Sequence, residues 1–137
     1  MKIKTLSLLL VILHFSCSPK KEKEEALKKI KPHEKLISFN MNYDVPNIIL
    51  KSYAESKKFD PKTDTIEYLK DEIYISYLEG VTGCVVYGGD IEIKNDTITL
   101  KLIELNNDAC TEVVYARVKY RIHNLGNIKY KIKKNYS

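Results

Sequence analysis

Three cysteines are the residues best suited to chemistry in this chain of 137 residues: Cys17, Cys84 and Cys110. A cysteine can be acylated, can pair in a disulfide, or can act as a thiolate nucleophile. The sequence has no Cys-x-x-Cys motif, so the pattern does not indicate a redox-active pair. Beyond residue 17 the histidines are His33 and His123, too few for a multi-histidine metal site.

Other catalytic patterns are missing from the sequence as well. The residues support no Ser-His-Asp or Cys-His arrangement, and no glycine-rich phosphate loop appears. His123 stands beside Asn124 at the end of an alternating segment, where we expect it to cap a turn. The sequence therefore predicts a protein that is not an enzyme, with no catalytic residues, no metal and no cofactor.

The N-terminus of the chain has the pattern of an export signal. Lys2 and Lys4 precede an apolar stretch, residues 5–15, that is too short to cross a bilayer as a helix. The stretch ends at Ser16–Cys17, and a small residue before such a cysteine resembles the signal of bacterial lipoproteins, in the relaxed form found in Bacteroidota. The resemblance implies that residues 1–16 are removed and that Cys17 is acylated as the new N-terminus. The alternative is an ordinary signal cleaved after Ser16 or Ser18.

This resemblance implies a location in the cell envelope and a membrane as the partner of the protein. An acylated Cys17 would hold the chain at a membrane, since two or more acyl chains anchor stably. Ser18, in place of an aspartate, favours the outer membrane over the inner one, and leaves open whether the protein faces the periplasm or the cell surface. Residues 17–35 then form a charged tether, with seven lysines and four glutamates after Cys17, and residues 36–137 form the folded domain.

The two remaining cysteines form an even pair once Cys17 is acylated. Export places Cys84 and Cys110 in an oxidising compartment, where thiols pair. We therefore predict a structural Cys84–Cys110 disulfide, which contributes about 3–4 kcal/mol in the chain-entropy model.

Beyond residue 35, apolar and polar residues alternate in short runs, which is typical of half-buried strands. Turn residues separate the runs, among them Asn95–Asp96 and residues 124–127, and Gly88–Gly89 indicates a bulge or bend. The predicted fold is all-β: an antiparallel meander of seven or eight strands, forming a lipocalin-like barrel or half-barrel. A two-sheet β-sandwich is the alternative. Runs 66–68, 73–77, 84–93, 98–102, 114–122 and 128–132 are expected strands, with 48–50 as a seventh and 36–41 as a candidate eighth.

Basic residues concentrate at the end of the chain. From residue 113 onward there are seven basic residues and no acidic ones. If runs 114–122 and 128–132 form a hairpin with their apolar residues inward, six cations share one outer face: Arg117, Lys119, Arg121, Lys129, Lys131 and Lys133. Such a face is either a solvated guard of a sheet edge or a patch for anionic lipid, acidic glycan or an acidic protein.

These features predict a membrane-anchored envelope lipoprotein with a non-catalytic β binding domain. The alternative is an inhibitor or immunity-type protein that blocks an envelope enzyme or toxin through a charged contact face. Nucleic acid is not an expected partner, because the domain is exported and has no recognition motif for bases. The sequence does not indicate an oligomeric state.

Overall fold

The computed structural model describes residues 30–43, 59–60, 63–106 and 111–135. These residues form seven strands and no helix, so none of the described segments can cross a bilayer as a helix. The strands are β1 (Leu36–Asn42), β2 (Thr65–Tyr68), β3 (Glu72–Thr82), β4 (Tyr87–Lys94), β5 (Thr97–Glu104), β6 (Val113–His123) and β7 (Lys131–Lys134). The all-β prediction is confirmed, and run 36–41 is a strand. Run 48–50 lies outside the described residues.

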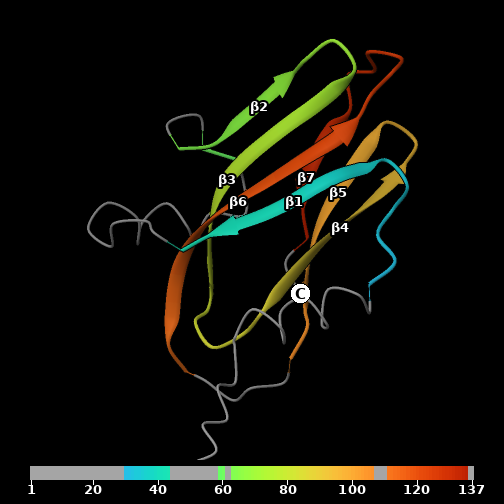
Figure 1. The fold of residues 1–137 in the computed structure, drawn as a ribbon. Helices are drawn as coiled ribbons and strands as arrows, with labels where there is room; N and C mark the ends of the chain where they lie inside the picture. The colour runs from blue at the N-terminus through green and yellow to red at the C-terminus, as the bar shows by residue number, and fades with distance from the viewer. Residues whose placement is uncertain (1–29, 44–58, 61–62, 107–110, 136–137) are drawn as a thin grey trace, which may run out of the picture.

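The strands make two sheets that lie in separate layers (Figure 1). One sheet has the order β1-β6-β3-β2 and the other has the order β4-β5-β7. All strand pairs are antiparallel except β5–β7, which is parallel. The described strands do not close into a hydrogen-bonded barrel, so the architecture is that of a two-sheet sandwich or half-barrel and not a closed lipocalin-like barrel.

Period-two alternation builds the core between the two sheets. In β3, Ile73 and Ile75 face inward with Tyr77, and none of the three side chains is more than 2% exposed. β6 contributes Val118, Tyr120 and Ile122, and the facing sheet contributes Ile91, Ile98 and Leu100. Burial of these branched and aromatic side chains is the main driving force that holds the layers together.

Two of the predicted hairpins are confirmed. β2 and β3 pair through the turn at residues 69–71, and β4 and β5 pair through Asn95–Asp96. Asn95 has a φ of 52°, in the left-handed region that asparagine tolerates in tight turns.

The predicted hairpin between the last two runs is wrong. β6 is hydrogen-bonded to β1 on one side and to β3 on the other, so neither of its edges is left for another strand. Asn124 is buried, and its side chain binds both the N–H and the C=O of Ile128. The chain then crosses to the other sheet, where β7 pairs with β5 (Figure 1).

The glycine pair Gly88–Gly89 also differs from its predicted role as a bulge or bend. Both residues lie in β4, which pairs with β5 in continuous register. Gly89 permits a close approach instead. The Phe39 ring of β1 lies against its backbone and packs edge-on against Tyr120, with ring centroids 5.2 Å apart. This contact closes the sandwich on the side where β1 meets β4.

The Gly89 contact gives a test of this closure. A Cβ at Gly89 would lie 2.7 Å from Cε2 of Phe39 and closer still to Cδ2 and Cγ, so Gly89→Ala must displace the ring. We expect a loss of about 2 kcal/mol or more in the free energy of unfolding by urea denaturation. Gly80→Ala is the matched control, because its Cβ would meet Tyr115 at 3.4 Å, an ordinary contact. Equal effects from the two substitutions would contradict the assigned role of Gly89.

Candidate functional site

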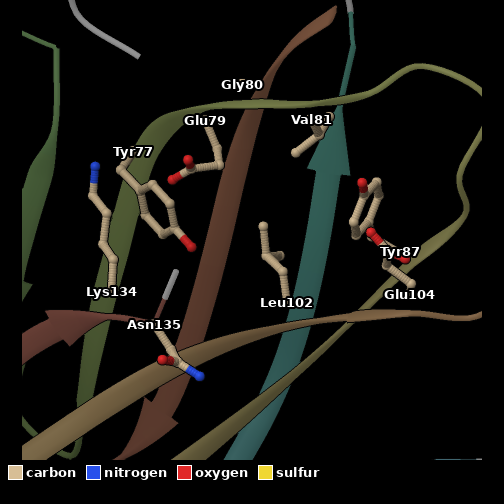
Figure 2. A pocket seen from close by; sticks show the side chains of 9 residues that line it. All are labelled: Tyr77, Glu79, Gly80, Val81, Tyr87, Leu102, Glu104, Lys134 and Asn135. Carbon is tan, nitrogen blue, oxygen red and sulfur yellow. The ribbon is translucent and has the colours of Figure 1, made fainter. Parts of the chain in front are cut away.

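A cleft of about 410 Å³ opens between the two sheets, at the end of the core where β3 runs past β2. β3 and the other sheet line it from opposite sides (Figure 2). Its lining combines two tyrosine rings and two aliphatic side chains with three charged groups. The lining residues are Tyr77, Glu79, Gly80, Val81, Tyr87, Leu102, Glu104, Lys134 and Asn135.

Glu79 is the central polar group of the cleft. It follows Ile73, Ile75 and Tyr77 on the inward-facing side of β3, so period two directs its carboxyl inward although the residue is charged. The residue is 7% exposed. Figure 2 shows its carboxyl among the lining side chains of the cleft, and among the described residues no hydrogen bond or ion pair holds it. Its oxygens are not among fully buried atoms that lack a hydrogen-bond partner, so the carboxyl reaches the open space of the cleft. A largely desolvated carboxyl at such a position favours its protonated form or a partner from outside.

Lys134 lies beside Glu79 but is engaged elsewhere. Its side chain is 3% exposed, and its Nζ is 3.5 Å from Oδ2 of Asp64, which is 4% exposed. The ammonium also lies over the rings of Tyr77 and Phe59, at 4.6 and 5.0 Å from their centroids. This ion pair joins β7 of one sheet to the residue that precedes β2 of the other.

Asp64 is itself held in place by backbone donors. The N–H of Leu78 donates to its Oδ1 at 3.2 Å and the N–H of Asp60 donates to its Oδ2 at 3.0 Å. Leu78 lies beyond the part of β3 that β2 covers, so the carboxylate satisfies an edge N–H that has no strand beside it. A carboxylate with these donors is a fixed partner for the Lys134 ammonium.

Burial raises the pKa of Glu79 from 4.5 to about 7. The first cause is desolvation of the carboxylate, which disfavours its charged form. The Lys134 charge lowers the pKa of Glu79 and the Asp64 charge raises it, so the two charges of the ion pair act in opposite directions. Glu79 therefore changes its charge near neutral pH.

Tyrosine hydroxyls fix the distance between the walls. Tyr120 of β6 donates to the carbonyl of Lys101 in β5 at 2.7 Å, and Tyr68 of β2 donates to the carbonyl of Tyr130 at 2.6 Å. The hydroxyl of Tyr87 in β4 accepts the N–H of Thr82 in β3 at 3.2 Å. The Tyr120 and Tyr87 bonds each join one sheet to the other, and the Tyr68 bond joins β2 to the segment that leads into β7. The cleft therefore lies between layers that are tied by hydrogen bonds.

The structure does not gather the six predicted cations on one face. Three are on β6 in one sheet, and three are on or beside β7 in the other. Several have local partners. Arg121 binds Glu72 through two N–H groups, Arg117 donates to the carbonyl of Thr63, and Lys131 pairs with Asp96 at 3.1 Å. Lys129 lies over the Tyr68 ring. Because β6 and β7 do not pair, the expected hairpin does not bring together Arg117, Lys119, Arg121, Lys129, Lys131 and Lys133, each of which is at least partly exposed. Binding of an anionic partner by these residues stays a prediction.

Two of the three cysteines, Cys17 and Cys110, lie outside the described residues. Cys84 lies in the exposed turn between β3 and β4. The amide of Asn106 donates to the carbonyl of Cys84 and accepts the N–H of Val86, which holds this turn against the end of β5. The acylation of Cys17 and the Cys84–Cys110 disulfide both stay predictions.

The sequence contains a signal for the cleft that motif analysis does not find. Glu79 continues the core parity of residues 73, 75 and 77, and Lys134 continues the parity of Tyr130 and Ile132. A charged residue on an inward-facing position of a strand indicates a buried partner or a functional cavity. Among the described residues, no group of histidine, cysteine and carboxylate side chains is arranged to hold a metal ion.

Comparison with known proteins gives no assignment: no family model matches the chain, and neither a curated protein nor a solved structure matches it. The function must therefore be argued from the cleft and from the sequence.

The raised pKa of Glu79 makes stability depend on pH. The folded protein retains a proton that the unfolded chain releases between pH 4.5 and about 7, so this residue lowers the stability as the pH rises through that window. Glu79→Gln removes the effect. We expect the variant to be more stable than the wild type at pH 8, by on the order of 2–3 kcal/mol, and equally stable near pH 4.5.

Urea denaturation at the two pH values measures this difference. Glu67→Gln is the control, because Glu67 is exposed on β2 and its substitution leaves the pH dependence unchanged. A Glu79→Gln variant that is less stable than the wild type at pH 8 would show that the carboxylate has a stabilising partner in the fold.

Proposed function

We propose that this protein is a lipid-anchored protein of the bacterial cell envelope whose β-domain binds a small ligand, without catalysis, in the cleft beside Glu79. The observation that carries the binding role is Glu79, a residue that is 7% exposed and whose carboxyl lines the cleft with no hydrogen bond or ion pair to the other described residues. A volume of about 410 Å³ is within the range of small-molecule sites. Buried ionisable groups with a shifted pKa also concentrate at functional sites.

The non-catalytic role is supported by the interactions of the polar side chains that neighbour Glu79. Lys134 is paired with Asp64, and the hydroxyl of Tyr87 accepts a backbone N–H. Both groups hold the two sheets together, and neither is arranged to activate the other. Glu79 is the buried carboxyl of the lining, with Glu104 exposed at the rim, and each can accept a hydrogen bond or pair with a charge on a ligand. This arrangement suits recognition rather than acid–base chemistry between paired residues.

The envelope address is supported by the sequence of the export segment. The short apolar stretch ends at Ser16–Cys17, and acylation of Cys17 leaves an even pair of cysteines. We propose the outer membrane as the location, with residues 17–35 as the tether.

The disulfide is supported by contacts on both sides of its predicted partner. The N–H of Gly83 donates to the carbonyl of Glu112 at 2.8 Å, and Asn106 binds Cys84 and Val86. Residues flanking Cys84 are thus hydrogen-bonded to residues that lie before and after Cys110 in the chain. Two residues of extended chain reach about 7 Å, so this geometry is compatible with a disulfide.

The inhibitor or immunity-type alternative depends on a charged contact face. Because the cations of β6 and β7 are divided between two sheets, no described surface favours that function over the binding role.

The anchor is tested by Cys17→Ala. Loss of the acylation site should move the protein from the membrane fraction to the soluble fraction of disrupted cells, because the tether and domain have no other proposed anchor. Ser18→Ala is the control and should leave the protein with the membrane. Unchanged sedimentation and processing of Cys17→Ala would contradict the lipid anchor.

A further inference from the structure

We propose that the cleft binds an organic cation, a protonated amine carried on an apolar or aromatic group, with its ammonium against the carboxylate of Glu79. This inference rests on the proposed binding function and names the chemical class of the ligand. The cation is a free amine or the side chain of a lysine in a peptide, because both present the same group.

The charges of the cleft favour a cation. Lys134 and Asp64 form a buried pair whose charges cancel. Glu79 and Glu104 then remain as two carboxylates on the lining, Glu79 buried within it and Glu104 exposed at its rim. Figure 2 shows them on different sides of Leu102, with Glu104 beside Tyr87. The electrostatic field of two carboxylates in a partly desolvated cleft attracts a positive group.

The same arrangement disfavours an anion. Lys134 is the one cation among the lining residues, but its ammonium is occupied by Asp64 and by the rings of Tyr77 and Phe59. Its side chain is 3% exposed, so an anion cannot reach it without breaking these contacts. An anion would also meet the carboxylates of Glu79 and Glu104.

The apolar part of the lining indicates which chemical group of the ligand lies next to its ammonium. Val81 and Tyr87 are 6% and 8% exposed, and with Leu102 they give the cleft an apolar wall beside Glu79. An ammonium joined to a short alkyl or aromatic group would place its charge at Glu79 and its apolar portion against this wall. Aromatic rings at the site also attract a cation through their faces.

Protonation of Glu79 makes the binding depend on pH. The charged and titratable groups that face it are Lys134 from β7, Asp64 before β2, Glu104 from β5, and the hydroxyls of Tyr77, Tyr87 and Tyr120. Because the pKa of Glu79 is about 7, its ionised fraction rises about tenfold between pH 6 and pH 8. The affinity for a cation should rise by about the same factor, since the bound form requires the carboxylate.

The test is a titration followed by amide resonances in NMR spectra. The full chain is expressed with its export segment and carries Cys17→Ser, which changes no described residue. The probes are 2-phenylethylamine as the cation, 2-phenylethanol as its neutral counterpart, 3-phenylpropanoate as an anion, and the blocked peptide acetyl-Ala-Lys-Ala-amide. We expect the amine to shift the resonances of Val81, Tyr87 and Leu102 at pH 8, and to bind at least about tenfold more tightly than the alcohol or the acid.

Variants separate the charge from the cavity. Glu79→Gln keeps the shape of the side chain and should weaken amine binding about tenfold and remove its pH dependence, whereas Glu67→Gln should change neither.

The probes identify the source of the cation. Binding of the peptide alone would assign the cation to a lysine side chain, and binding of the amine alone would assign it to a small molecule; both support the inference. Equal binding of amine and alcohol in the cleft would overturn the cation while leaving the binding function intact. If none of the probes shifts the cleft resonances, the proposed binding function fails as well.

Discussion

The buried ion pair between Lys134 and Asp64 is the contact on which the cleft depends. β7 has four residues and pairs with β5 alone, so backbone hydrogen bonds stabilise its position only weakly. The ion pair attaches this short strand to the far sheet, just before β2 begins and where the edge of β3 is uncovered. Both charges are almost fully removed from water, and that is tolerable because backbone donors and two aromatic rings surround the pair.

Burial, and not the charge of the ion pair, is the first cause of the raised pKa of Glu79. With Lys134 committed to Asp64, the neighbouring carboxyl is buried without a described partner and titrates near neutral pH. Tyrosine hydroxyls hold the layers at a fixed spacing around it, so the sheets do not collapse onto the carboxyl. The ten tyrosines and absence of tryptophan thus have a structural reason in part, because a phenol can pack in the core and still reach a carbonyl of the opposite sheet.

The sequence predicted the local features of the fold better than its long-range pairing. Alternation identified β3 and β6, and Asn95–Asp96 identified the β4–β5 turn, because these signals depend on neighbouring residues. β7 pairs with β5 because β1 and β3 already occupy both edges of β6. The alternation of apolar and polar residues within one segment does not show which strands occupy those edges. The cleft was missed because motif analysis seeks sets of catalytic residues. Its signal in the sequence was one charged residue at an inward-facing position on each of two strands, Glu79 on β3 and Lys134 on β7.

A double-mutant cycle on the ion pair tests this account most directly. The free energy of unfolding is measured for the wild type, Asp64→Asn, Lys134→Met and the double variant, with Lys133→Met as the exposed control from the same strand. We predict that Lys134→Met costs about 3–5 kcal/mol, because it leaves Asp64 charged and buried, and that the double variant loses much less than the sum of the two single changes. Additive losses, or a Lys134→Met variant as stable as Lys133→Met, would contradict the claim that this pair holds β7 against the far sheet.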